Sequence, residues 1–391
     1  MRRIICLALV FFSLLPLLAC AAGADEGKAA AAEETAELLV INVGKGDALL
    51  LRAGEKAWLI DAGKRIRWGK LAAALRENGI TRLNGVFLTH TDADHAGGLL
   101  PLALSDIEVE TWYASAYYSS PKKEKKHPAV IAAAVRGQEV VFLEAGDTAE
   151  GLFTVLAPFE ESENEDDNSL VLRTKINGVS LLLAGDMELG EEEMLLSSGA
   201  DLSCTVLKVP NHGDNDACSD ALIARTGVKI ALISTDPEEK PGTPDMDLID
   251  ALDEAGADIY RTDFSGGGIR VTLFEGEAEA DYFDAPEDTG RFACALTVSD
   301  TEEEWIFLTN TDTADADLTD FYFITDRDGN IFLFPQGTIL PAGKTLSIGT
   351  LSCPEETDLI WKEENVLSNK KSDGLILYTA GGNVAAEWYS D

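Results

Sequence analysis

The sequence has little positive charge. Its 391 residues include 31 lysines and arginines against 69 aspartates and glutamates, so the formal net charge is −38. This balance argues against a broad nucleic-acid-binding face, because affinity for a phosphate backbone needs positive charge. A polyanionic ligand would therefore need a local basic patch or bound metal ions. Hydrophobic residues make up 46% of the chain, and its length suits two or three domains with packed cores.

Long apolar runs are also scarce, and the one that exists lies at the N-terminus. Residues 4–18 are apolar and follow two arginines, but the run is too short and wrongly flanked for a spanning helix. The pattern predicts a signal peptide over residues 1–20. Its end, "LLAC", resembles the bacterial lipobox, so Cys20 is the predicted lipidation site of an exported protein anchored to the extracytoplasmic face of the cell membrane. Ordinary cleavage nearby is the alternative, and a polar tether over residues 21–37 follows.

Cysteines are few, and none shows a C-x-x-C spacing, which argues against a cysteine zinc site. Beyond Cys20 an even number remains, as expected for an oxidising compartment. Cys204 with Cys218 and Cys294 with Cys353 are plausible disulfides, because each pair lies within one predicted domain. The sequence leaves this connectivity open.

From residue 38 onward, apolar runs that read as strands alternate with helical segments and short glycine-rich turns. The order strand, strand, helix, strand favours an α+β fold, an αββα arrangement of two facing sheets with helices outside, over residues 38–285. The acidic, turn-rich stretch 275–291 is interpreted as a linker. Residues 292–391 contain short aromatic strands and many turns, which predicts a small all-β, immunoglobulin-like sandwich.

The stretch "THTDADH" directly follows the apolar run "GVFL" and gathers His90, Asp92, Asp94 and His95. In an extended loop, residues two apart point to the same side, and His95 turns inward as a helix begins. Imidazole and carboxylate groups are common ligands of zinc, manganese and related divalent ions. This loop is therefore a candidate metal site.

Two further polar residues follow apolar strands in the same way. Asp186 ends "LLLAGD", and His212 lies in "LKVPNHGD". Three of the protein's four histidines thus belong to one candidate constellation, and the fourth, His127, is expected at the surface. The acidic run 160–167 is interpreted as a solvated loop rather than a cation site.

These motifs occur in an order that resembles the metallo-β-lactamase fold, specifically the branch found as the extracellular domain of bacterial DNA-uptake competence proteins. The resemblance covers residues 38–274 and rests on "INVGKGDALLL", "WLIDAG", "FLTHTDADHAGGL", "NSLVL", "LLLAGD" and "LKVPNHG". Asp92 marks the competence branch, because the wider superfamily has a histidine there.

The resemblance implies a hydrolase with two divalent metal ions, zinc or manganese. It implies Asp186 as the bridging carboxylate, with Asp94 and Asp186 as the catalytic carboxylates. The implied metal ligands are His90, Asp92, Asp94, His95, Asp186 and His212.

Three positions depart from the pattern of the superfamily. Asn211 replaces the first of two histidines usually found before the glycine of "LKVPNHG", and Thr243 replaces a histidine usually found before proline. Asn168 stands where other branches have a histidine ligand, although the competence branch also tends to have asparagine there. These departures raise the question of whether the second metal is fully held.

The competence-type resemblance implies cleavage of DNA or another phosphodiester. Lys64 and Arg65 in one basic cluster and Lys122 in another are candidate substrate-binding residues, and Asn211 or a lysine is a candidate for steadying the charge that develops. The alternatives are a hydrolase of another ester or of a lactam, and a metal-poor, non-catalytic binding lipoprotein on the same fold. In the two basic clusters, solvated loops are the plain alternative to substrate contacts.

The tail has a resemblance of its own. "EEEWIFLTN", "DLTDFYFITDRDGN" and "FPQGTILPAGKTLSI" are similar to the lamin tail domain, an immunoglobulin-like sandwich, over residues 294–389. The resemblance implies an accessory role in positioning or binding, and the ligand of the tail stays unknown. It carries no catalytic residues over to this chain.

Overall fold

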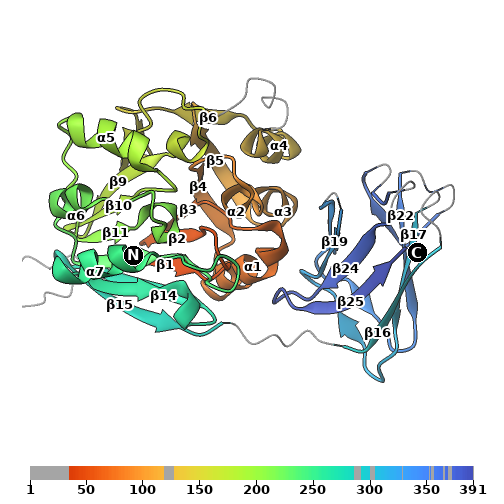
Figure 1. Ribbon diagram of the computed structural model, residues 1–391. Coiled ribbons are helices and arrows are strands. Elements are labelled where there is room, and N and C mark those ends of the chain that lie inside the picture. Colours follow the sequence, from red (N-terminus) through yellow and green to blue (C-terminus); the bar gives the residue numbers. More distant parts are fainter. Residues whose placement is uncertain are drawn as a thin grey trace, which may run out of the picture. The chain divides into compact units, whose positions relative to one another are not determined.

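The computed structural model describes residues 35–118, 127–285, 292–299, 304–327, 329–351, 353, 356–363, 366–368 and 372–390. Up to residue 285 the chain forms two β-sheets that face each other, with helices on both outer sides (Figure 1). This is the αββα arrangement that the sequence predicts, and the α+β fold class is confirmed. The predicted signal peptide, Cys20 and Lys122 lie outside the described residues.

The first sheet has eight strands in the order β15-β14-β1-β2-β3-β4-β5-β6. Strands β3 to β6 pair in parallel, while the other neighbours pair antiparallel. The strands are β1 (Ala36–Ile41), β2 (Leu49–Ala53), β3 (Lys56–Ile60), β4 (Arg82–Leu88), β5 (Glu108–Ser115), β6 (Val140–Leu143), β14 (Gly268–Phe274) and β15 (Glu277–Phe283).

The second sheet has seven strands in the order β13-β12-β11-β10-β9-β8-β7. Strands β10 to β13 are parallel, so their carboxyl ends share one edge. The strands are β7 (Thr148–Ala149), β8 (Phe153–Ala157), β9 (Val171–Ile176), β10 (Val179–Leu183), β11 (Val206–Lys208), β12 (Ile230–Ile233) and β13 (Asp258–Arg261).

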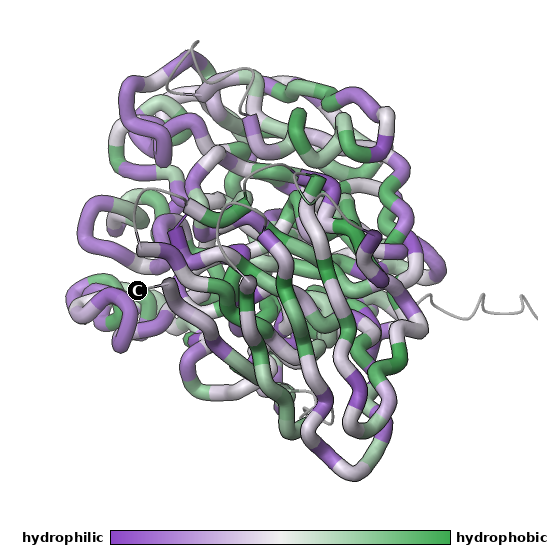
Figure 2. Tube along the Cα trace, turned by 90° about the vertical axis from the view of Figure 1, so that its right-hand side faces the viewer, coloured by the Kyte–Doolittle hydropathy of each residue, from purple (hydrophilic) through white to green (hydrophobic). Residues whose placement is uncertain are grey.

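Helices cover the outer face of each sheet. Apolar residues of α1, α3 and α4 pack on the first sheet and those of α5, α6 and α7 on the second, while a third apolar layer fills the space between the sheets. Figure 2 shows hydrophobic stretches along the strands and hydrophilic ones in many of the connecting turns. In the described part of the chain, no helix is long and apolar enough to cross a membrane. The helices are η1 (Arg65–Arg67), α1 (Trp68–Glu77), α2 (Ala93–Ala96), α3 (Leu99–Leu104), α4 (Pro128–Val135), η3 (Asp166–Asn168), α5 (Leu189–Ser197), η4 (Pro210–Gly213), α6 (Asp220–Thr226), α7 (Met246–Glu254) and η5 (Thr262–Phe264).

The interpretation of residues 275–291 as a linker is wrong for its first part. Residues 277–283 form β15, which pairs with β14 over its full length. Acidic and apolar residues alternate here, so Ala278, Ala280 and Tyr282 pack against the layer between the sheets. The acidic side chains then point the other way, which is why the stretch looks like a solvated loop in sequence.

The tail consists of strands, as predicted. Two four-stranded sheets, β16-β17-β22-β23 and β20-β19-β24-β25, enclose an apolar core, and a short pair β18-β21 completes the sandwich. The strands are β16 (Cys294–Val298), β17 (Trp305–Asn310), β18 (Ala316–Asp317), β19 (Tyr322–Thr325), β20 (Ile331–Leu333), β21 (Ile339–Leu340), β22 (Thr345–Thr350), β23 (Leu359–Trp361), β24 (Gly374–Tyr378) and β25 (Val384–Tyr389).

The suggested pairing of Cys204 with Cys218 is not present in the structure, where both are buried free thiols. Both belong to the apolar layer under α5, α6 and α7. Burial raises the pKa of Cys204 to about 12 and raises that of Cys218 further. Cys294 is likewise a free thiol. These cysteines behave as small apolar side chains rather than as cross-links.

His127 is buried rather than exposed, so its expected surface position is wrong. It is the residue before α4, and its ring packs edge-on against Tyr118 and Phe142, with centroid distances of 5.0 and 5.5 Å. Burial lowers the pKa of His127 to about 4. The sequence predicts a surface position because the histidine directly follows a lysine-rich segment, which is typical of a solvated loop.

The low pKa of His127 predicts that the folded protein loses stability in acid. In the unfolded chain, the imidazole of His127 has a pKa of about 6.5 and binds a proton below that pH. In the folded chain, its pKa is about 4, so it stays neutral until the pH falls to about 4. The free energy of unfolding should therefore fall by about 2–3 kcal/mol between pH 7 and pH 4.5 on account of His127. We expect His127→Phe to remove that part of the loss in urea unfolding at the two pH values. Parallel pH curves for both proteins would contradict the assignment.

Candidate metal centre

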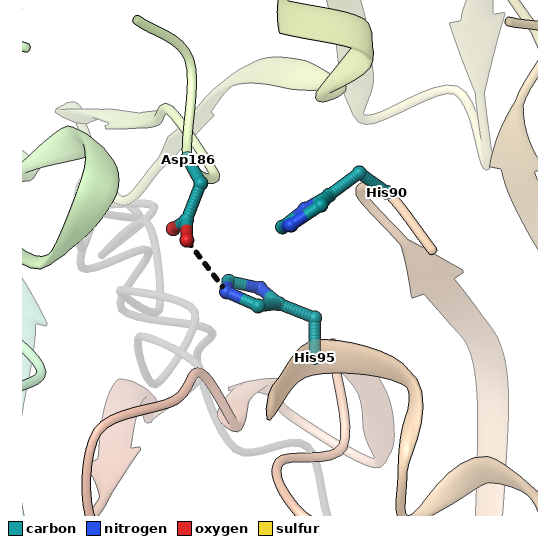
Figure 3. A group of neighbouring side chains, drawn as sticks. All are labelled: His90, His95 and Asp186. Atoms are coloured by element: carbon teal, nitrogen blue, oxygen red, sulfur yellow. Dashed lines mark hydrogen bonds and ion pairs between the residues drawn. The ribbon is translucent and has the colours of Figure 1, made fainter. Parts of the chain in front are cut away.

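The ends of several strands deliver the polar residues of one site. β4 ends two residues before His90, β10 ends shortly before Asp186, and β11 ends shortly before His212. β10 and β11 run in parallel, so the loops that follow them lie side by side. The turn of α2 then brings in His95, which is fully buried. Figure 3 shows His90, His95 and Asp186 pointing toward one another.

Three buried ligand atoms form a small triangle. Asp186 Oδ2 lies 3.0 Å from His95 Nε2 and 2.9 Å from His212 Nε2, and the two imidazole nitrogens are 3.3 Å apart. Two atoms bound about 2.0–2.1 Å from a tetrahedral zinc ion are about 3.3 Å apart. The triangle therefore has the size of one face of such a coordination sphere. The side chain of Asp94 lies near its edge, with Oδ2 3.8 Å from His212 Nε2.

Each histidine is held through its Nδ1, which leaves Nε2 for the site. His95 Nδ1 lies 2.8 Å from Asp61 Oδ2, and His212 Nδ1 lies 2.8 Å from the carbonyl oxygen of Ser234. His90 Nδ1 lies 3.1 Å from Thr89 Oγ1, whose own proton is donated to Asp61. Partners of this kind fix the tautomer and the ring orientation of metal-binding histidines.

Among the candidate ligands, two buried atoms have no hydrogen-bond partner in the described part of the chain. They are His90 Nε2 and Asp186 Oδ1. Burial and the nearby His95 lower the pKa of His90, which keeps its ring neutral and able to bind a metal. Burial opposes ionisation of Asp186, but His212 and His95 hold its pKa well below its usual range. Buried polar atoms are rarely left unsatisfied, so these residues fit a bound cation.

The C-terminal end of the acidic run 160–167 belongs to this site, so the interpretation of the whole run as a solvated loop is wrong. Asp166 Oδ1 lies 3.5 Å from His90 Nε2, and ligand atoms of Asp166, His90 and Asp92 lie within 4.8 Å of one another. Burial and the nearby carboxylates of Asp186 and Asp92 raise the pKa of Asp166 to about 8. A divalent cation would relieve this crowding of carboxylates.

Asp186 connects the two groups of candidate ligands. Its Oδ2 completes the triangle with His95 and His212, and it also shares a group with His90. Its other oxygen, Oδ1, is the one without a partner among the described residues. This is the placement that a bridging carboxylate would need.

The chain matches known protein families. A family model described as the metallo-beta-lactamase superfamily matches residues 41–236. The chain belongs to this superfamily. A second model, the lamin tail domain, matches residues 285–391. Both predicted resemblances are therefore confirmed at the level of the family, and the fold is one on which metal-dependent hydrolases are built.

Curated relatives match more than half of the chain. It is 26% identical over 249 residues to ComE operon protein 3 of Bacillus subtilis and 29% identical over 238 residues to competence protein ComA of Neisseria gonorrhoeae. The matches cover 59% and 60% of this chain but only 32% of each relative. Among solved structures, the metallo-beta-lactamase fold protein YhfI of Bacillus subtilis aligns with a TM-score of 0.40 and 12% identity, over 63% of this chain and 100% of that one.

The residues that depart from the superfamily pattern have other partners in the structure. The side chain of Asn168 accepts from the backbone N–H of Ser162 and donates to the carbonyl oxygens of Ser162 and Asn164. It thereby ties down the loop that carries Asp166. Thr243 is buried, and its carbonyl oxygen accepts from the hydroxyl of Thr235.

The candidate substrate residues are placed differently from one another. Asn211 donates its side-chain amide to Glu188 Oε1 at 3.1 Å and to Asp216 Oδ1 at 3.0 Å, so it is engaged with these acids. Lys64 forms an ion pair with Glu239, and Arg65 is half-buried in η1. The side chains of Lys64 and Asn211 are thus both engaged by carboxylates of the same chain.

Lys45 is a residue of this site that sequence reasoning missed. Its ammonium lies 2.8 Å from Asp94 Oδ2, and both side chains are partly exposed at the mouth of the site. Burial acts to raise the pKa of Asp94, but His95 and Lys45 together lower it to about 2. The "VGKGD" turn carried the signal, because its lysine stands in a glycine-bounded loop directly after a buried strand.

Proposed function

We propose that this chain is an exported, metal-dependent phosphodiesterase that cleaves DNA. One observation carries the proposal: Asp186 Oδ2, His95 Nε2 and His212 Nε2 form a buried triangle of ligand size. Beside it, His90 Nε2 and Asp186 Oδ1 have no hydrogen-bond partner among the described residues. The resemblance of the sequence motifs to the competence branch, together with the similarity to competence protein ComA, supports DNA as the substrate. Export and lipid anchoring through Cys20 belong to the same proposal.

Asp92, which marks the competence branch, favours a phosphodiester over a lactam. Asp92, Asp94, Asp166 and Asp186 make the donor set rich in oxygen, which suits manganese as well as zinc. His90, Asp92 and Asp166 would hold one ion, His95, His212 and Asp94 the other, and Asp186 would bridge them. When bound, two such ions would activate a water molecule and neutralise the charge of the phosphate group.

The residues of the chain contribute orientation and charge. Asp61 accepts hydrogen bonds from the backbone N–H and the hydroxyl of Thr89, and it contacts His95 Nδ1, so it couples the start of the motif loop to the ring that it aims. Lys45 places an ammonium group beside Asp94, where it can stabilise negative charge that develops on a substrate oxygen.

The proposal predicts metal-dependent cleavage of labelled single-stranded DNA by the purified protein. With manganese or zinc, wild type should cut the strand, and Asp94→Ala should be slower by about a hundredfold or more, the upper end of losses seen at residues around metal sites. Asp201→Ala is the matched control, because it removes the carboxylate of an exposed ion pair with Arg173 of β9. Product lengths on a denaturing gel provide the measurement.

This assay, together with cephalosporin hydrolysis and metal analysis of the same protein, separates the alternatives. Equal cleavage by wild type and Asp94→Ala would refute the site. Hydrolysis of a chromogenic cephalosporin without cleavage of DNA would favour the lactam reading. Less than one metal ion per chain, together with no hydrolysis, would favour a binding protein on this fold.

A further inference from the structure

Outside the metal centre, three cationic or N–H donors converge on one carboxylate. Glu239 Oε2 accepts from the backbone N–H of Lys45 at 3.3 Å and from the ammonium of Lys64, while Oε1 accepts from the guanidinium of Arg67 at 2.9 Å. The side chain of Glu239 is 23% exposed. In a chain with a net charge of −38, this concentration of donors on one oxyanion is unusual.

The backbone beside this carboxylate is shaped to receive an anion. Gly44 has a φ of +80°, and a Cβ built on it would lie 2.6 Å from Glu239 Oε1. A side chain here would displace the carboxylate, and the positive φ favours glycine at this position. We call Gly44, the Lys45 N–H, Lys64 and Arg67 together the cradle. Backbone N–H groups in turns, combined with lysine and arginine, are the usual means of binding phosphate groups.

The cradle is joined to the metal centre through a single residue. Lys45 donates its backbone N–H to Glu239, and its ammonium contacts Asp94 Oδ2 at 2.8 Å. Asp94 in turn lies near His212 of the ligand triangle. An anion in the cradle would therefore sit one residue away from the proposed reaction centre, as the phosphate next to the cleaved one would.

Glu239 can leave this position without disturbing the core. It lies in the loop after β12, in a turn whose backbone N–H bonds return to Asp236. Burial acts to raise the pKa of Glu239, but Lys64 and Arg67 lower it, so the group stays anionic at neutral pH. Partly exposed ion pairs of this kind are weak, and an anion with more charge can compete for the same donors.

We propose that Gly44, the Lys45 N–H, Lys64 and Arg67 form a phosphate-binding site, and that Glu239 of the same chain occupies it as an internal competitor. The identity of the anion as a phosphate of the substrate rests on the proposed function. A substrate with a single phosphate group would place it at the metal centre, and Glu239 would stay in the cradle. A substrate with two neighbouring phosphate groups could place the second one in the cradle, so the site favours substrates of this kind.

The test measures the binding of inorganic phosphate to the full-length protein as purified, by isothermal titration calorimetry at low salt. Glu239→Gln keeps the shape of the side chain and removes its charge, so it should bind phosphate about three- to tenfold more tightly at this site than wild type. Lys64→Gln combined with Arg67→Gln should lose this binding. Asp201→Asn, which opens an exposed ion pair elsewhere, should match wild type.

Equal phosphate affinity of wild type and Glu239→Gln would overturn the proposal, as would full binding by the Lys64→Gln, Arg67→Gln protein. Turnover adds a second measurement: Glu239→Gln should lower KM for an oligonucleotide several-fold and leave KM for bis(p-nitrophenyl) phosphate, which has one phosphate, unchanged. The binding result needs no turnover. An inactive enzyme therefore leaves the anion site testable, and loss of the anion site leaves the proposed hydrolysis standing.

Discussion

Lys208→Met is expected to lower the free energy of unfolding by about 3–5 kcal/mol, the range seen when one partner of a buried ion pair is removed. Lys208 Nζ lies 2.7 Å from Asp47 Oδ2, and each side chain is only 1% exposed. Burial acts to raise the pKa of Asp47, but Lys208, His95 and His212 together lower it. Without the ammonium, an ionised carboxylate would stay buried without its ion-pair partner. Urea unfolding at pH 7 measures the loss.

The pH dependence and a double variant check the cause. In Lys208→Met, the ammonium no longer opposes the effect of burial on Asp47, so the defect is full at neutral pH and shrinks as the pH falls and the carboxyl takes up a proton. Asp47→Asn combined with Lys208→Met should recover most of the stability, because removing both charges of a buried pair is often close to neutral. A loss below about 1 kcal/mol in the single variant would show that water reaches the pair.

This ion pair also has a consequence for the site. The backbone N–H of Asp47 donates to the carbonyl oxygen of Asp94 at 3.1 Å, and Lys208 is the last residue of β11, just before the turn that carries His212. The pair therefore ties together two loops that supply candidate ligands. We expect variants of this pair to affect metal binding as well as folding.

The αββα arrangement of residues 38–285 could be predicted from the sequence, because its strands are apolar runs bounded by glycine-rich turns. Two facing sheets are a simple way to bury such strands. β15 escaped prediction because its acidic outer face hides a period-two apolar pattern at Ala278, Ala280 and Tyr282. His127 escaped because burial of a lone histidine depends on the aromatic residues that fold over it.

The candidate ligands could be found because His90, Asp186 and His212 each follow an apolar strand, and strand ends gather loops at one edge. Asp166 could not, since it stands in a run of acidic residues and only the folded loop shows which carboxylate turns inward. The contacts of Asp47 with Lys208 are equally long-range. The predicted ligand roles themselves stay predictions until metal is measured.

Asp186→Asn is expected to have the largest effect on the metal centre. Asparagine keeps the shape of the side chain but removes the charge that faces His95 and His212 at 3.0 and 2.9 Å, and an amide is a poor bridging ligand. Metal content should fall from two ions to one or none per chain by elemental analysis. Hydrolysis should fall by more than about a hundredfold, since even residues behind the ligands cost ten- to a hundredfold.

Asp61→Asn separates a ligand from a positioning residue. Asp61 contacts His95 Nδ1 at 2.8 Å and is fully buried behind the ligand triangle, so its variant should retain metal more weakly and lose about tenfold in rate. Both variants need a check of the fold by circular dichroism, because each removes a buried charge. If Asp186→Asn keeps two ions per chain and Asp61→Asn does not, the bridging role belongs elsewhere in the site. If both keep two ions and full activity, the triangle of His95, His212 and Asp186 serves the fold rather than a metal.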